Sequence, residues 1–67
     1  MASGGDAGKR REIFVEFTVL GGSVKVAAID SVTGLEVSIV GPATAPRAEL
    51  ERNVLAKLDY VQKKRAD

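Results

Sequence analysis

The side chains that could carry out chemistry in this sequence are carboxylates, amines, guanidinium groups and hydroxyls, because the 67 residues include no His and no Cys. Without Cys there are no disulfides, thiolate nucleophiles or Cys-based zinc and iron–sulfur sites. Without His the commonest general base and the imidazole metal ligand are missing. We therefore expect no cofactor and no bound metal, and the sequence predicts a protein that is not an enzyme.

Three carboxylates, Glu12, Glu16 and Glu36, are candidates for paired acid–base chemistry. Glu16 and Glu36 share one face of the sheet predicted below, but they fall on its two outer strands at different heights. No predicted cleft sequesters them, as paired acid–base chemistry requires. They are interpreted as solvated strand residues.

Basic residues form two short runs near the ends of the chain, Lys9-Arg10-Arg11 and Lys63-Lys64-Arg65. Such runs are candidates for contacts with nucleic acid or an anionic membrane surface. However, the formal net charge is only +1, no aromatic residue is interleaved with either run, and the second run suits the negative end of a helix. Solvated chain ends are the simpler interpretation. The residues that would contact a polyanion are Arg10, Arg11, Lys63, Lys64 and Arg65.

The beginning of the chain, MASGGDAG, is rich in Gly and nearly free of hydrophobic bulk. This composition predicts a disordered N-terminal tail over residues 1–10 and a single domain over residues 11–65. The tail lacks the apolar core and basic start of a secretory signal. The longest apolar runs are far below the ~20 residues that span a membrane. We therefore expect a cytoplasmic protein with no membrane contact.

Three segments have the alternation and β-branched content of strands: 12–20, 23–30 and 35–40. Gly21-Gly22 predicts a two-residue hairpin loop in which Leu20 pairs with Ser23. A second turn over residues 30–34 sets Ala28 against Val37. One face of the resulting antiparallel meander, order 1-2-3, then collects Ile13, Val15, Phe17, Val19, Val24, Val26, Ala28, Leu35, Val37 and Ile39, and a one-residue slip would destroy it.

A helix is predicted from Pro46 to about Arg65, because Pro suits a first helical turn and the apolar residues after it fall within one arc at ~100° per residue. We expect this helix to lie across the apolar sheet face. The predicted fold class is α+β: a three-stranded antiparallel β-meander covered on one face by a single C-terminal α-helix (β-β-β-α).

The other sheet face is more apolar than a solvated antiparallel face usually is. In the predicted register Phe14 lies opposite Ile29. We interpret this face as a surface for a partner, most simply a second copy of the chain, although contact through an outer strand edge stays open. The candidate interface residues are Phe14, Leu20, Ile29 and Val40.

The segments VKVAAID, TGLEVSIVGPA and KLDYVQKKR resemble a family of short bacterial proteins, mainly alphaproteobacterial, with a domain of unknown function. The resemblance runs from Arg11 to roughly Arg65. It implies a small cytoplasmic domain of unknown function and brings no catalytic or ligand residues with it. TVLGGSVKVAAID and PRAELERNVL are also loosely similar in layout to the carbon-storage regulator, a small RNA-binding dimer. That family has five strands per chain where three are predicted here, and its basic RNA-contact motifs have no counterpart.

These observations predict a small, non-enzymatic protein-interaction module that works as a homodimer, with an unknown protein partner also possible. The alternative is a small RNA- or DNA-binding regulatory protein that uses the two basic ends. The net charge of +1 disfavours nucleic acid as the partner.

Overall fold

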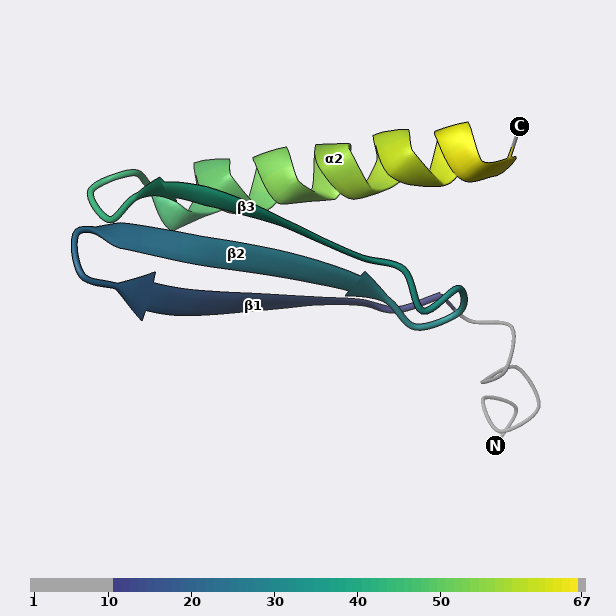
Figure 1. The fold of residues 1–67 in the computed structure, drawn as a ribbon, viewed down its shortest axis with the longest axis horizontal. Coiled ribbons are helices and arrows are strands. Elements are labelled where there is room, and N and C mark those ends of the chain that lie inside the picture. Colours follow the sequence, from purple (N-terminus) through teal and green to yellow (C-terminus); the bar gives the residue numbers. More distant parts are fainter. Residues whose placement is uncertain (1–10, 67) are drawn as a thin grey trace.

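The computed structural model describes residues 11–66, so the tail predicted over residues 1–10 lies outside the described part of the chain. The elements in chain order are β1 (Ile13–Leu20), β2 (Ser23–Asp30), β3 (Glu36–Pro42) and the helix α2 (Arg47–Ala66). The strands form one antiparallel sheet in the order β1-β2-β3, and α2 lies over it (Figure 1). The predicted α+β class and strand order are confirmed.

The strand register also agrees with the prediction. Leu20 pairs with Ser23 across the first hairpin, and Ala28 lies between Val15 on β1 and Val37 on β3. Gly21 has a φ of 64° while Gly22 has no positive φ, which is the pattern of a type II′ turn. Since this turn matches the right-handed twist of the strands, Gly21 sets the register from the hairpin outward.

The hydrophobic core lies between α2 and the strands β2 and β3. Val26 and Val54 are fully buried at its centre. The helix begins just after Pro46, whose carbonyl accepts hydrogen bonds from the N–H groups of Glu49 and Leu50. The buried hydrophobic residues of this core are Val24, Val26, Ala28, Val37, Leu50, Val54 and Leu58.

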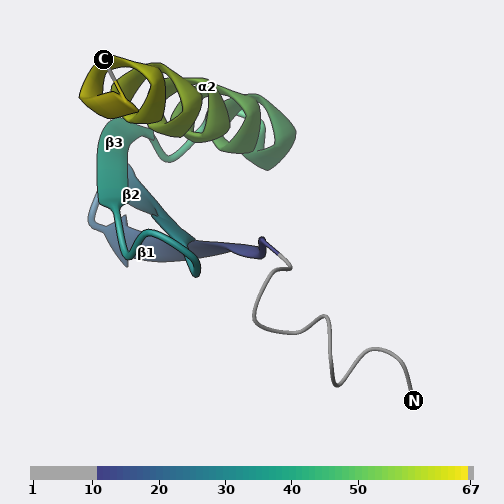
Figure 2. The same ribbon diagram turned by 90° about the vertical axis from the view of Figure 1, so that its right-hand side faces the viewer.

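The helix covers less of the sheet than the sequence predicted. It packs on β2 and β3, and β1 is the strand farthest from it (Figures 1 and 2). Phe17 faces the helix side as predicted but is only half-buried at the margin of the core, and Val19 is 61% exposed. The reason is width: a helix is about 10 Å across and strands are about 4.8 Å apart, so one helix covers about two strands.

One glycine is required by the close approach of α2 to β3. A Cβ atom built on Gly41 would lie 2.7 Å from a methyl group of Leu50, whereas a Cβ on Gly22 would have no atom within 4 Å. Leu50 is buried, so it has little room to move aside.

We expect Gly41→Ala to lower the free energy of unfolding by about 1–3 kcal/mol, because it overpacks the helix–sheet contact. The matched control Gly22→Ala should change it by less than about 0.5 kcal/mol. Urea unfolding of both variants at one protein concentration measures the difference. Equal stabilities would show that α2 does not lie this close to β3.

Candidate functional site

The four residues predicted to form an interface all lie on the sheet face away from α2. Phe14 and Leu20 are each 53% exposed, Val40 is 66% exposed and Ile29 is half-buried. Phe14 and Ile29 are cross-strand neighbours, whereas Leu20 and Val40 lie toward the other end on different strands. The structure therefore brings two of the four together and leaves no continuous patch.

A polar band crosses this face between the two apolar ends. Glu16 pairs with Ala27, which pairs in turn with Ser38, and in the next row Thr18 pairs with Lys25. Glu16, Thr18 and Lys25 are exposed. A second sheet packed face to face here would have to bury these charged groups, which costs free energy unless each is paired.

Strand β1 has a second set of apolar side chains on its helix-facing side. Val19 is exposed there, and Ile13, Val15 and Phe17 are half-buried. The Arg47 guanidinium lies 4.8 Å from the centre of the Phe17 ring. This surface was not expected from the sequence, because the alternation of apolar residues assigns the whole face to the core. The width of one helix against three strands was the signal that would have revealed it.

The outer edge of β1 carries unpaired backbone groups. The Ser31 N–H donates a hydrogen bond to the Glu12 carbonyl at 2.9 Å, and Leu20 pairs with Ser23 across the hairpin. Because hydrogen-bonded pairs alternate along an antiparallel ladder, the even-numbered residues of β1 are the ones that bond to β2. The N–H and C=O groups of the odd-numbered residues consequently point away from the sheet. Within residues 11–66 no strand pairs with this edge. The residues concerned are Ile13, Val15, Phe17 and Val19.

The outer edge of β3 is protected by comparison. The Lys57 ammonium donates a hydrogen bond to the Ser38 carbonyl at 2.8 Å. Pro42 has no N–H to offer, and Glu36 places a charge on the strand. Charged side chains and proline are the usual means by which sheet edges avoid pairing with other chains. Of the two edges, β1 is the one open to another strand.

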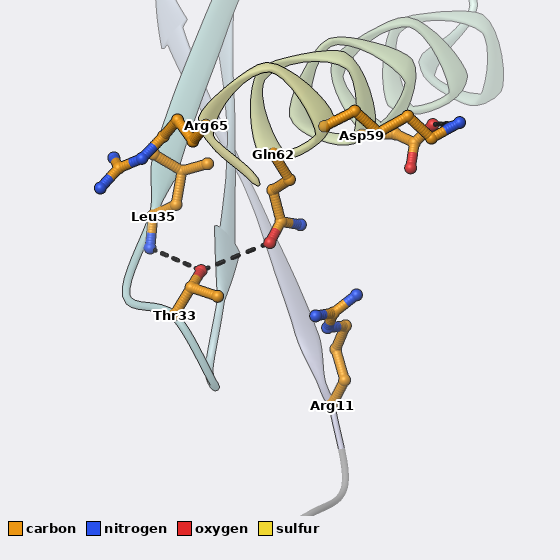
Figure 3. A pocket seen from close by; sticks show the side chains of 7 residues that line it. Arg11, Thr33, Leu35, Asp59, Gln62 and Arg65 are labelled. Atoms are coloured by element: carbon orange, nitrogen blue, oxygen red, sulfur yellow. Dashed lines mark hydrogen bonds and ion pairs between the residues drawn. The ribbon is translucent and has the colours of Figure 1, made fainter. Parts of the chain in front are cut away.

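Described residues from both basic runs come together at one end of the molecule. Arg11, Lys63 and Arg65 line an open cavity of about 530 Å³ beside the last turns of α2 (Figure 3). The Thr33 hydroxyl lies 3.5 Å from the Gln62 side-chain oxygen across this cavity. The complete lining is Arg11, Thr33, Leu35, Asp59, Gln62, Lys63 and Arg65.

Asp30 is a buried charge that contacts two residues of this lining, Arg11 and Thr33. Its Oδ1 accepts hydrogen bonds from the N–H groups of Val32 at 2.7 Å and Thr33 at 3.1 Å. Its Oδ2 receives no hydrogen bond within residues 11–66 and lies 3.0 Å from Arg11 Nε. Burial alone raises the pKa of this carboxyl, but the bonds from Thr33 and Val32, the Gln62 side chain and the Arg11 charge outweigh burial and hold the pKa below its ordinary value of 3.8.

Two of the three cations at the cavity are therefore compensated. Arg11 is paired with Asp30, and Lys63 lies 3.2 Å from Asp59. Lys64 does not line the cavity, and its ammonium lies 5.9 Å from the centre of the Tyr60 ring. Arg10 lies outside the described residues. Of the five predicted polyanion contacts, the structure gathers Arg11, Lys63 and Arg65 and leaves a cluster of low net charge.

Two other kinds of site are absent from the described part of the chain. Residues 11–66 contain no group of three or more side chains able to hold a metal ion. No helix within the same residues is long and apolar enough to cross a bilayer. Within residues 11–66, β1 leaves its outer edge unpaired and exposes apolar side chains on both of its faces.

Fold and surface together define a small α+β domain whose three-stranded meander keeps one outer strand uncovered. Comparison with known families is consistent with this size and extent: the model of a domain of unknown function, DUF6898, matches residues 10–65. The chain belongs to this family. Comparisons with curated proteins and with solved structures gave no match.

Asp30 gives the fold a dependence on acidic pH. Because the pKa of its carboxyl is lower in the folded chain than its ordinary value of 3.8, ionised Asp30 stabilises the fold above that value. This contribution is lost as the pH falls through 3.8 toward the lower pKa of the folded state. We expect Asp30→Asn to reduce the loss of unfolding free energy at acidic pH. Urea unfolding between pH 3 and pH 7 measures it.

The matched control is Asp59→Asn, because Asp59 is 66% exposed and pairs only with the exposed Lys63 among the described residues. It should leave the acid dependence of unfolding close to that of the native chain. An acid dependence that is the same in the native chain and in Asp30→Asn would contradict the assignment.

Proposed function

We propose that this protein is a non-enzymatic protein-interaction module that works as a homodimer. The observation that carries the proposal is the state of β1, which exposes apolar side chains on both faces and unpaired backbone groups along its edge. Exposed edge strands of this kind are templates for pairing with another chain. Chains of this size also bury only ~60% of their unfolded surface, so association adds stability that a single copy lacks.

The expected contact is small. One strand and a few side chains from each copy place it at the low end of stable protein interfaces. Its apolar part comes from Phe14, Val19 and Leu20, each of them more than half exposed in the single chain. We therefore expect a dissociation constant of about micromolar, which corresponds to roughly 8 kcal/mol of association free energy.

Sedimentation equilibrium of the full chain from one to several hundred micromolar tests this proposal. The expected result is a reversible shift from the 7.1 kDa monomer to twice that mass. A single monomeric species across the whole range would refute self-association. A dimer that forms only in low salt would point to charge rather than apolar contact.

A second candidate, binding of RNA or DNA, has one observation in its favour. Arg11, Lys63 and Arg65 come from opposite ends of the chain and line the same cavity. Two of these charges are already paired with carboxylates, and no exposed aromatic side chain lines the cavity to stack on a base. The interaction-module proposal is better supported for this reason.

Fluorescence anisotropy with labelled single-stranded RNA and duplex DNA decides between the two candidates. We expect no binding tighter than about micromolar at physiological salt, the range of non-specific association. Submicromolar binding that weakens with salt and is lost in Lys63→Glu/Arg65→Glu would reverse the ranking. The control is Lys25→Glu, which makes a charge change on the opposite face of the sheet.

A further inference from the structure

We propose that two copies of this chain associate by antiparallel pairing of their β1 strands, centred on Phe17, to form one continuous six-stranded sheet. This inference rests on the proposed homodimer and specifies its contact. The occupant of the open β1 edge is then β1 of the second copy.

The side chains of β1 are arranged symmetrically about Phe17. The stretch Phe14–Leu20 reads FVEFTVL, with an apolar residue at each end, a valine next to each end and a polar residue on each side of the central Phe. Antiparallel pairing about Phe17 sets Phe14 against Leu20, Val15 against Val19 and Glu16 against Thr18. Every pair matches like with like, as cross-strand packing favours.

The backbone agrees with this centre. A two-fold axis at an odd-numbered residue makes Phe17 of both copies a hydrogen-bonded pair, and the free N–H and C=O groups of β1 are those of its odd-numbered residues. Val15 and Val19 then exchange further pairs of bonds with the second copy. The unpaired groups along the edge are thereby satisfied without any change in the strand.

Neighbouring registers fit less well. A centre at Glu16 places two carboxylates directly opposite each other, which is unfavourable. A centre at Val15 leaves the exposed Val19 and Leu20 beyond the end of the paired region. A centre at Thr18 sets Glu16 against Leu20. The Phe17 register avoids all three mismatches.

Charge complementarity also favours this register. Glu16 is the one charged side chain of β1, and Thr18 of the second copy would be its neighbour. Lys25 follows Thr18 in the same row, about 10 Å from Glu16 at two strand spacings. The long lysine side chain can extend over the small Thr18 toward the carboxylate.

The geometry also accounts for an assembly of two copies and no more. Antiparallel pairing of identical strands puts both α2 helices on the same side of the sheet, each over its own β2 and β3. The two Phe17 side chains meet in the strip between the helices, flanked by Arg47 of each copy. The new outer edges are both β3, where Lys57 and Pro42 oppose further pairing.

Figures 1 and 2 show that this approach is open in the described part of the chain. β1 forms the side of the sheet opposite to α2 in both views, and no described element lies beyond its outer edge.

The first experiment removes one edge donor. Val15→Pro deletes an N–H that points away from β2, so the bonds within the chain are kept, while two bonds of the proposed dimer are lost. Val15→Thr retains the N–H and nearly the same shape. By sedimentation, we expect the dissociation constant to rise at least tenfold for Val15→Pro and to stay within about threefold for Val15→Thr, with circular dichroism reporting the fold of each.

The second experiment stays informative even if Val15→Pro fails to fold. The chain has no Cys, so Glu16→Cys and Thr18→Cys chains each carry a single thiol. In the Phe17 register these two positions face each other at a Cα separation of about 4.5 Å, while like positions are about 7–8 Å apart. Mild oxidation should therefore cross-link the mixture as a heterodimer far more than either chain alone, since disulfides need less than about 7 Å.

The outcomes separate this inference from the proposal beneath it. Val40→Asp is the matched control, because Val40 is exposed on β3 and lies away from the β1 edge. A dimer that dissociates in Val40→Asp but persists in Val15→Pro would overturn the β1 contact and keep the homodimer. Equal cross-linking of like and unlike chains would also overturn this register. A native chain that is always monomeric would overturn both and leave the β1 edge to a strand of another protein.

Discussion

The structure depends on a mismatch of width between one helix and three strands. A helix is about 10 Å across, and neighbouring strands are about 4.8 Å apart. One helix therefore cannot cover three strands at once. α2 therefore covers β2 and β3, and the buried core residues come from α2, β2 and β3. β1 keeps its place through its bonds to β2, while its helix-facing side chains lie at the margin of the core. The open surface of the protein follows directly from this arrangement.

The two edges of the sheet differ because α2 lies beside only one of them. The helix brings Lys57 to the Ser38 carbonyl, and the chain leaves β3 through Pro42 on its way to α2. Neither device reaches β1, which is first in the sheet and farthest from the helix (Figure 2). An edge that selection against aggregation would normally block is thus left available, and a strand partner is the simplest use of it.

Much of the fold could be predicted from sequence, and the reasons are local. The Gly21-Gly22 loop and the strict alternation on both sides of it determine the register, because a slip of one residue exchanges the two faces. The extent of helix cover could not be read from alternation, since Val19 and Val24 have the same pattern but very different exposure. Pattern indicates which face a side chain is on, whereas the position of its strand in the sheet decides whether it is buried.

At the candidate site, too, some features can be predicted from the sequence and others need the fold. That Arg11 and Lys63 share one end follows from topology alone, because three antiparallel strands and a returning helix place the start of β1 beside the end of α2. Their ion pairs with Asp30 and Asp59 differ in this respect. The Asp59–Lys63 spacing is visible in the sequence, whereas the contact of Arg11 with Asp30 joins the segment before β1 to the last residue of β2 and needs the fold.

The Arg11–Asp30 contact is one of the few interactions that keep β1 ordered while its outer edge stays open to another strand. Among residues 11–66, β1 is held by one neighbouring strand, by the Arg11–Asp30 pair just before its first residue and by Arg47 over Phe17 near its middle. Elements with few buried contacts open at a lower free-energy cost than the rest of a domain. A strand added to the free edge would give β1 a second set of backbone bonds and would stabilise only the folded state. Dimer formation and the ordering of β1 would then be coupled. The monomer would be least stable at β1, the strand that the second copy pairs with.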